Sequence, residues 1–175
     1  MQLTKHRWVI PALFVALAAF TTNVALADHI AVATASGTVL TPITVTKSND
    51  LDFGSSIFPG IDKSVTATSA SAAKFTVGGE AGKQVTIVFD LPTELTKVGG
   101  ATMPISFGAT DAGRNTGNVQ AEATSFDPNS TETTTLEAEN GTLYIWLGGT
   151  VSPAHNQSAG EYSADITVTL EYTGS

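Results

Sequence analysis

The segment "GEYSADITVTLEY", from Gly160 to Tyr172, decides the fold class of this chain. From Tyr162 onward every second residue is apolar or small, and polar residues occupy the positions between them. A period of two is typical of a β-strand that buries one of its faces. The sequence therefore predicts one regular strand near the end of the chain. Its buried face would comprise Tyr162, Ala164, Ile166, Val168, Leu170 and Tyr172.

The same alternation recurs across most of the chain after residue 27. It is clear near residues 75–77, 85–91, 103–107 and 143–147, with turn-forming residues in between. No stretch there has the period of a helix. The pattern predicts an all-β protein with a single antiparallel immunoglobulin-like β-sandwich. Residues 108–140 have few large apolar side chains, and predict a surface excursion with one or two weak strands.

The first 27 residues have the form of a secretory signal peptide. Two cations precede an apolar run, which ends in Ala-Leu-Ala at residues 25–27. Cleavage there would leave residues 28–175 as one exported domain, in the periplasm, on the cell surface or in the medium. We expect no membrane insertion after cleavage, because the remaining chain is acidic and its ending "EYTGS" is polar, without a hydrophobic anchor.

Charge and cysteine content exclude several classes of function. Cleavage would leave six Lys and Arg residues against sixteen Asp and Glu. An acidic chain repels phosphate backbones and anionic lipids, so nucleic acid is not an expected partner. The chain has no cysteine, and therefore no disulfide, thiol nucleophile or thiolate ligand. A packed core must supply its stability.

No constellation of residues predicts catalysis. His29 and His155 are isolated and belong to no zinc-binding or nucleophile motif. We predict that the protein is not an enzyme and has no catalytic residue, cofactor or metal. One weak match to a calcium loop runs from Asp111 to Glu122, but Gly113 stands where a ligand is required and no helices flank it. The sequence leaves calcium binding by this loop open.

The stretch "GTLYIWLGG" is apolar on both faces. Tyr144 and Trp146 lie two residues apart, so their rings share one face of the predicted strand. Such a pair can form a platform for a glycan or a surface polymer. The pair can instead pack beneath a loop or a neighbouring subunit. The sequence favours this packing interpretation, because strands buried on both faces are common in compact sheets. A secreted glycan-binding module is therefore the alternative function.

Five blocks of the sequence resemble a known bacterial family. They are "TPITVTKSNDLDFGSSIFPG", "FTVGGEAGKQVTI", "ATMPISFG", "GTLYIWLGG" and the segment quoted first. In order, they resemble domain of unknown function 4402 from about residue 33 to residue 172. The most specific pieces are the "LDFG" block at residues 51–54, Gly79-Glu80 before Gly82, and the ending. The resemblance implies secretion and a β-sandwich, and it implies no enzymatic activity.

A more distant likeness concerns the end of the chain. The spacing of Gly160 and Tyr172 is similar to that in subunits of chaperone-usher pili and spore-coat U type proteins. In such subunits the sandwich lacks a strand, and the N-terminal extension of a neighbour fills the groove. Those pilins usually carry a Cys pair, which is absent here. The likeness implies a pilin-like structural subunit whose partners are like subunits or a periplasmic chaperone.

The candidate donor, or first strand, lies in residues 28–46. Two phases of alternation are possible, one through Ile30 and Val32 and the other through Ala33, Ala35, Gly37 and Val39. This segment pairs either with another chain or with its own sandwich. The predicted partner-binding residues are Ile30, Val32, Gly37, Val39, Tyr162, Ile166, Val168, Leu170 and Tyr172.

Overall fold

The computed structural model describes residues 30–174 of the chain. Within them the regular structure is β-sheet, apart from one short 3-10 helix, η1 (Gln120–Glu122). Every strand pairing is antiparallel. The predicted all-β fold is confirmed. The chain divides into two units after Gly37, and all the strands belong to the second; residues 30–37 form no strand.

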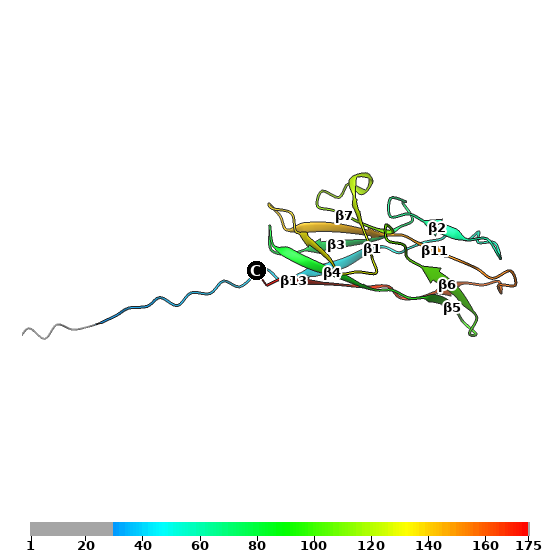
Figure 1. The fold of residues 1–175 in the computed structure, drawn as a ribbon, viewed down its shortest axis with the longest axis horizontal. Helices are drawn as coiled ribbons and strands as arrows, with labels where there is room; N and C mark the ends of the chain where they lie inside the picture. The colour runs from blue at the N-terminus through cyan, green and yellow to red at the C-terminus, as the bar shows by residue number, and fades with distance from the viewer. Residues whose placement is uncertain (1–29, 175) are drawn as a thin grey trace, which may run out of the picture. The chain divides into compact units, whose positions relative to one another are not determined.

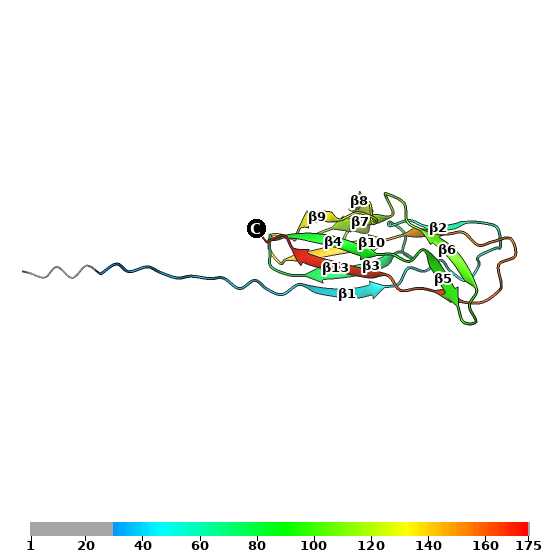
Figure 2. The ribbon, with the colours of Figure 1, turned by 60° about the horizontal axis from the view of Figure 1, so that its bottom comes forward.

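Two sheets face each other across the main core (Figures 1 and 2). The first has the order β1 (Thr44–Asn49), β3 (Ala73–Gly78), β10 (Thr142–Leu147), β7 (Ala112–Asn115) and β8 (Thr124–Phe126). The second has the order β13 (Thr167–Tyr172), β4 (Gln84–Asp90) and β9 (Glu132–Thr135). Alternate residues point inward from both sheets, as the period of two requires. The buried cluster between them includes Phe75, Val77, Val85, Ile87, Leu143, Ile145 and Leu170.

A third sheet lies at the end of the sandwich away from Tyr172 (Figures 1 and 2). Its order is β12 (Tyr162–Ser163), β5 (Glu94–Lys97), β6 (Thr102–Ser106), β11 (Gly149–Val151) and β2 (Lys63–Val65). Its own buried cluster consists of Leu95, Met103, Ile105 and Val151. This sheet joins the two layers, because β11 continues from β10 of the first layer while β5 follows β4 of the second.

The regular segment from Tyr162 to Tyr172 is not one strand. β12 pairs with β5, β13 pairs with β4, and residues 164–166 between them belong to no strand. The interruption lies opposite the link between β4 and β5, which contains Pro92. Proline has no backbone N–H to donate to a ladder, so the pairing stops in both segments at this point.

The predicted surface excursion at residues 108–140 is more ordered than expected. β7 pairs with the central strand β10, and β8 pairs with β7. Ala112 and Phe126 are buried in the main core. A few small or aromatic side chains are enough to anchor these short strands, because their long partner β10 fixes their position.

Candidate functional site

One lateral edge of the sandwich is closed. β8 leads into β9 through the turn at residues 127–130, so the chain itself bridges the two layers. Nε and a terminal guanidinium nitrogen of Arg114 lie 2.8 and 2.7 Å from Oε1 of Glu132. Asn129 Nδ2 donates to the Phe107 carbonyl at 2.8 Å and fixes the turn. These contacts tie the two layers together at this edge, where β8 pairs with β7 and β9 pairs with β4.

The opposite edge is open. Within residues 30–174, β1 pairs with β3 alone and β13 pairs with β4 alone. All six residues of β1 are exposed, whereas Ile166 and Val168 are half-buried against the main core. Each of these two strands therefore has one edge without a strand partner. Such edges accept an added strand, because backbone hydrogen bonds form without any change to the existing sheet.

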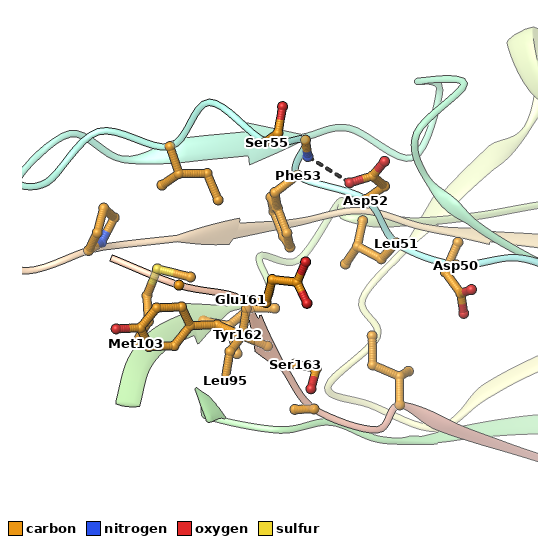
Figure 3. Close-up of a pocket in the computed structure, with 18 of the residues that line it drawn as sticks. Asp50, Leu51, Asp52, Phe53, Ser55, Leu95, Met103, Glu161, Tyr162 and Ser163 are labelled. Carbon is orange, nitrogen blue, oxygen red and sulfur yellow. Dashed lines mark hydrogen bonds between the residues drawn. The ribbon is translucent and has the colours of Figure 1, made fainter. Parts of the chain in front are cut away.

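A cavity of about 1230 Å³ opens between the two edges (Figure 3). The end of β1 and residues 50–55, which follow it, form one wall, and residues 157–166 form the other. Figure 3 shows Phe53 and Leu51 on one side, with Tyr162, Leu95 and Met103 on the other. The lining also includes Phe75, Ile105 and Ile57. Its apolar floor and open top suit the side chains of an extended peptide.

The "LDFG" block builds the first wall. Leu51 packs against all three core clusters, and Phe53 packs against two of them. The Asp52 amide donates to the Ser71 carbonyl at 2.9 Å, and the Gly54 amide donates to Asp52 Oδ1 at 2.7 Å. Gly54 has a φ of 79°, which favours glycine. The wall is therefore fixed by its own turn as well as by the core.

Tyr172 closes the other end of the open edge. Its hydroxyl accepts the Glu80 amide at 2.6 Å and donates to the Thr41 carbonyl at 2.6 Å. Glu80 Oε2 accepts the amide and the hydroxyl of Thr41 at 3.0 and 2.5 Å. A Cβ atom on Gly79 would lie 2.7 Å from the Tyr172 hydroxyl, so the ring needs glycine there. These contacts fix the chain just before β1.

The hydrogen bonds from Thr41 to the Glu80 carboxylate are expected to weaken in acid. The hydrogen bond from the Thr41 hydroxyl, followed by that from its amide, lowers the pKa of Glu80 from its ordinary value of 4.5. A lowered pKa stabilises the fold above the ordinary value, and this contribution is lost as pH falls through the lowered value. Hydrogen exchange of the Thr41 amide should therefore quicken below about pH 4.5, relative to its intrinsic rate.

The control is the variant Glu80→Gln. Its Thr41 amide should exchange faster at neutral pH, and the exchange rate should show no such dependence on acid. Equal exchange in both proteins at every pH would contradict the role given to the carboxylate.

A comparison with protein families extends this picture. Residues 61–172 match the family described as Domain of unknown function (DUF4402). The chain belongs to this family. The DUF4402 match runs from the residues before β2 to the end of β13, and so includes the second cavity wall and Tyr172. The "LDFG" wall and β1 precede the matched range. A search of curated proteins finds no match to the chain.

The structure brings the predicted C-terminal residues of this DUF4402 chain together along the open edge. Tyr162 and Ile166 line the cavity. The Tyr162 hydroxyl donates to the Ser158 carbonyl at 2.7 Å, which holds the ring in place. Val168, Leu170 and Tyr172 continue along the inward face of β13. Their role in binding a partner stays a prediction.

The predicted N-terminal residues lie outside every strand. Ile30, Val32 and Gly37 belong to the first unit, and Val39 stands just before β1 with 95% of its surface exposed. Ile30 and Val32 are exposed as well. The signal peptide and His29 lie outside the described residues. No helix among residues 30–174 has the length and apolar character needed to cross a membrane.

Several cavity residues of the DUF4402 chain were not selected from the sequence as site residues. Leu51 and Phe53 come from the segment after β1, whereas Leu95 and Met103 face each other across the β5–β6 pair. Leu51 and Phe53 also pack, partly buried, against the core clusters. Only the sheet pairing shows that they also face a cavity.

Trp146 and Tyr144 form a packed cluster in the DUF4402 chain. Trp146 is only 2% exposed and is buried with Val65, Ala67 and Ala72. The rings of Tyr144 and Trp146 stack with centroids 6.3 Å apart, and Lys74 Nζ lies 5.3 and 5.8 Å from them. The face of Trp146 is therefore closed to a ligand, and this favours the packing interpretation of the pair.

The Asp111–Glu122 loop supplies its own backbone with hydrogen-bond partners. Asp111 Oδ2 accepts the Gly108 amide at 2.7 Å, and Asn115 Oδ1 accepts the Gly117 amide at 2.6 Å. In the described part of the chain, no group of three or more His, Cys, Asp or Glu residues is arranged to hold a metal ion.

Proposed function

We propose that the protein is an exported structural subunit of a fimbria-like or other cell-surface assembly, formed through β-strand pairing. In this proposal the sandwich is immunoglobulin-like and pilin-like, with the place of one strand left open. The N-terminal segment of one copy adds to the open edge of another. The supporting observation is a difference between the two lateral edges. A turn and the Arg114–Glu132 ion pair bridge the layers at one edge, whereas a cavity lies beside the unpaired sides of β1 and β13 at the other.

The donor segment matches this edge in length and character. Residues 30–40 contain no charged side chain, and they number eleven, as do residues 162–172 along the edge. Both spans reach about 35 Å when extended. An inserted strand gains backbone hydrogen bonds with β1 and β13, and covers the half-buried Ile166 and Val168. Each large apolar side chain that it buries contributes about 1.5–3 kcal/mol.

The same edge would accept a strand from a periplasmic chaperone before assembly. An open edge next to a cavity is an aggregation hazard until it is covered. A chaperone and a second copy of the chain would therefore compete for one surface, and only the second copy gives a lasting assembly.

The test compares residues 28–175 with a truncated chain starting at Thr41. The truncated chain keeps every described strand and the residues that bond to Tyr172. We expect the full mature chain to form polymers in light scattering. The truncated chain should stay folded and monomeric, and should bind a labelled peptide of residues 28–40 in an anisotropy titration.

The matched control is the same peptide with its residues scrambled, which should not bind. A stable monomer of the full chain, together with unfolding of the truncated one in calorimetry, would show that the segment completes its own sandwich. If the truncated chain is folded but does not bind the peptide, the proposal is also overturned.

A further inference from the structure

Two large apolar side chains are exposed in the loop between β1 and β2. Phe58 is 64% exposed and Ile61 is 61% exposed. They belong to one turn, in which the Ile61 amide donates to the Phe58 carbonyl at 3.1 Å. This loop precedes β2, so the turn lies toward the end of the sandwich away from Tyr172 (Figure 2).

The turn is held firmly against a second loop. The Gly60 amide donates to the Pro153 carbonyl at 3.0 Å. Gly60 has a φ of 74°, and a Cβ atom there would lie 2.2 Å from His155 Nδ1. The backbone thus fixes Phe58 and Ile61 in water, where they cannot turn inward to a core. Fixed, adjacent apolar side chains on a surface are typical of a contact site.

The exposed turn is continuous with the cavity. Ile57 and Pro59 line the cavity, whereas their neighbours Phe58 and Ile61 face solvent. A partner body that extends beyond the cavity mouth would therefore meet the turn, whereas a strand confined to the cavity would not. This continuity links the exposed pair to the open edge between β1 and β13.

We propose that Phe58 and Ile61 form a second contact between subunits, against the body of the copy that donates its strand. This inference rests on the proposed function. The donor segment ends at Leu40, one residue before Thr41, which Tyr172 and Glu80 bind. The body of the donor therefore begins at its own Tyr172 end, directly after the inserted strand. If Leu40 lies at the cavity, that end meets the turn of the receiving copy.

This contact fixes the direction of the inserted strand. The strand runs from the Tyr172 end toward the cavity, parallel to β1 and antiparallel to β13. Consecutive copies then meet head to tail through two different surfaces, which generates an open filament. The opposite direction would bring two Tyr172 ends together and allow closed pairs, with Phe58 and Ile61 left in water. The exposed turn favours the first arrangement.

The test is the double variant Phe58→Ser/Ile61→Ser in residues 28–175. Loss of a central apolar contact weakens an interface by about tenfold or more. The concentration at which polymers appear in light scattering should rise by at least that factor. The same variant of the truncated chain should bind the peptide of residues 28–40 with unchanged affinity. The control Val119→Ser, at a 42% exposed position before η1, should polymerise as the unmodified chain does.

These readouts separate the two proposals. Unchanged polymerisation with intact peptide binding would overturn the second contact alone. Absence of peptide binding to the unmodified truncated chain would overturn the strand-pairing proposal, and with it the second contact.

Direction is tested separately with disulfides, because the chain has no cysteine of its own. A peptide carrying Leu40→Cys should couple to Glu161→Cys beside the cavity, and one carrying Ile30→Cys should couple to Glu171→Cys. The reverse pairing would overturn the head-to-tail arrangement.

Discussion

Trp146→Ala is expected to lower the free energy of unfolding by about 3–5 kcal/mol. Trp146 is 2% exposed, and its ring fills the space among Val65, Ala67 and Ala72. Three small or medium neighbours cannot close the gap, so the variant loses both the buried area and the packing around it. Urea denaturation followed by circular dichroism measures the change. Trp146 is the only tryptophan after residue 27, so fluorescence would lose its reporter.

Tyr144→Ala is the matched comparison for this cluster. Tyr144 is only half-buried, although it stacks on Trp146 and lies under Lys74. Its loss should cost about 1 kcal/mol. If both variants cost the same small amount, the packing interpretation fails and the glycan platform regains support. A glycan titration monitored by Trp146 fluorescence would then decide, and no response across a broad panel would exclude the platform.

The alternation of apolar residues predicted the sheets well because it is a local signal. Five of the six residues expected on one buried face are buried or half-buried, whereas Ala164, in the interruption between β12 and β13, is exposed. Local alternation could not show that their segment is split. The split depends on Pro92, about seventy residues earlier, in the partner of that segment.

The cavity was beyond prediction for a related reason. Its floor joins Phe75 of β3 to Leu95 and Met103, which face each other across the β5–β6 pair, and no spacing in the sequence brings β3 to that pair. The open edge also depends on an arrangement of whole strands, since β1 and β13 lie at the ends of their sheets and no turn links them directly. Pairing between distant strands is set by the complete fold, whereas the buried face of each strand is set by its own residues.

Gly148→Ala is expected to destabilise the protein by at least about 1–3 kcal/mol, through steric conflict rather than through a lost contact. Gly148 lies between β10 and β11, where the chain passes from the first sheet into the third. A Cβ atom there would lie 2.1 Å from the Val65 carbonyl oxygen and 2.8 Å from the Thr66 carbonyl carbon. These are backbone atoms, so no side-chain rotation relieves the overlap, and β2 must move away.

The same displacement should reach the candidate site. β11 pairs with β2 on one side and β6 on the other, and β6 carries Met103 and Ile105 of the cavity floor. Gly148→Ala in the truncated chain should therefore weaken binding of the peptide of residues 28–40, as well as lower the free energy of unfolding. Gly108→Ala is the control. A Cβ atom at Gly108 would lie 3.5 Å from its nearest neighbour, Asp111 Oδ2, which is an ordinary van der Waals distance. If the two variants were equally stable and bound the peptide equally well, the third sheet would be less rigidly coupled to the sandwich than the close approach at Gly148 implies.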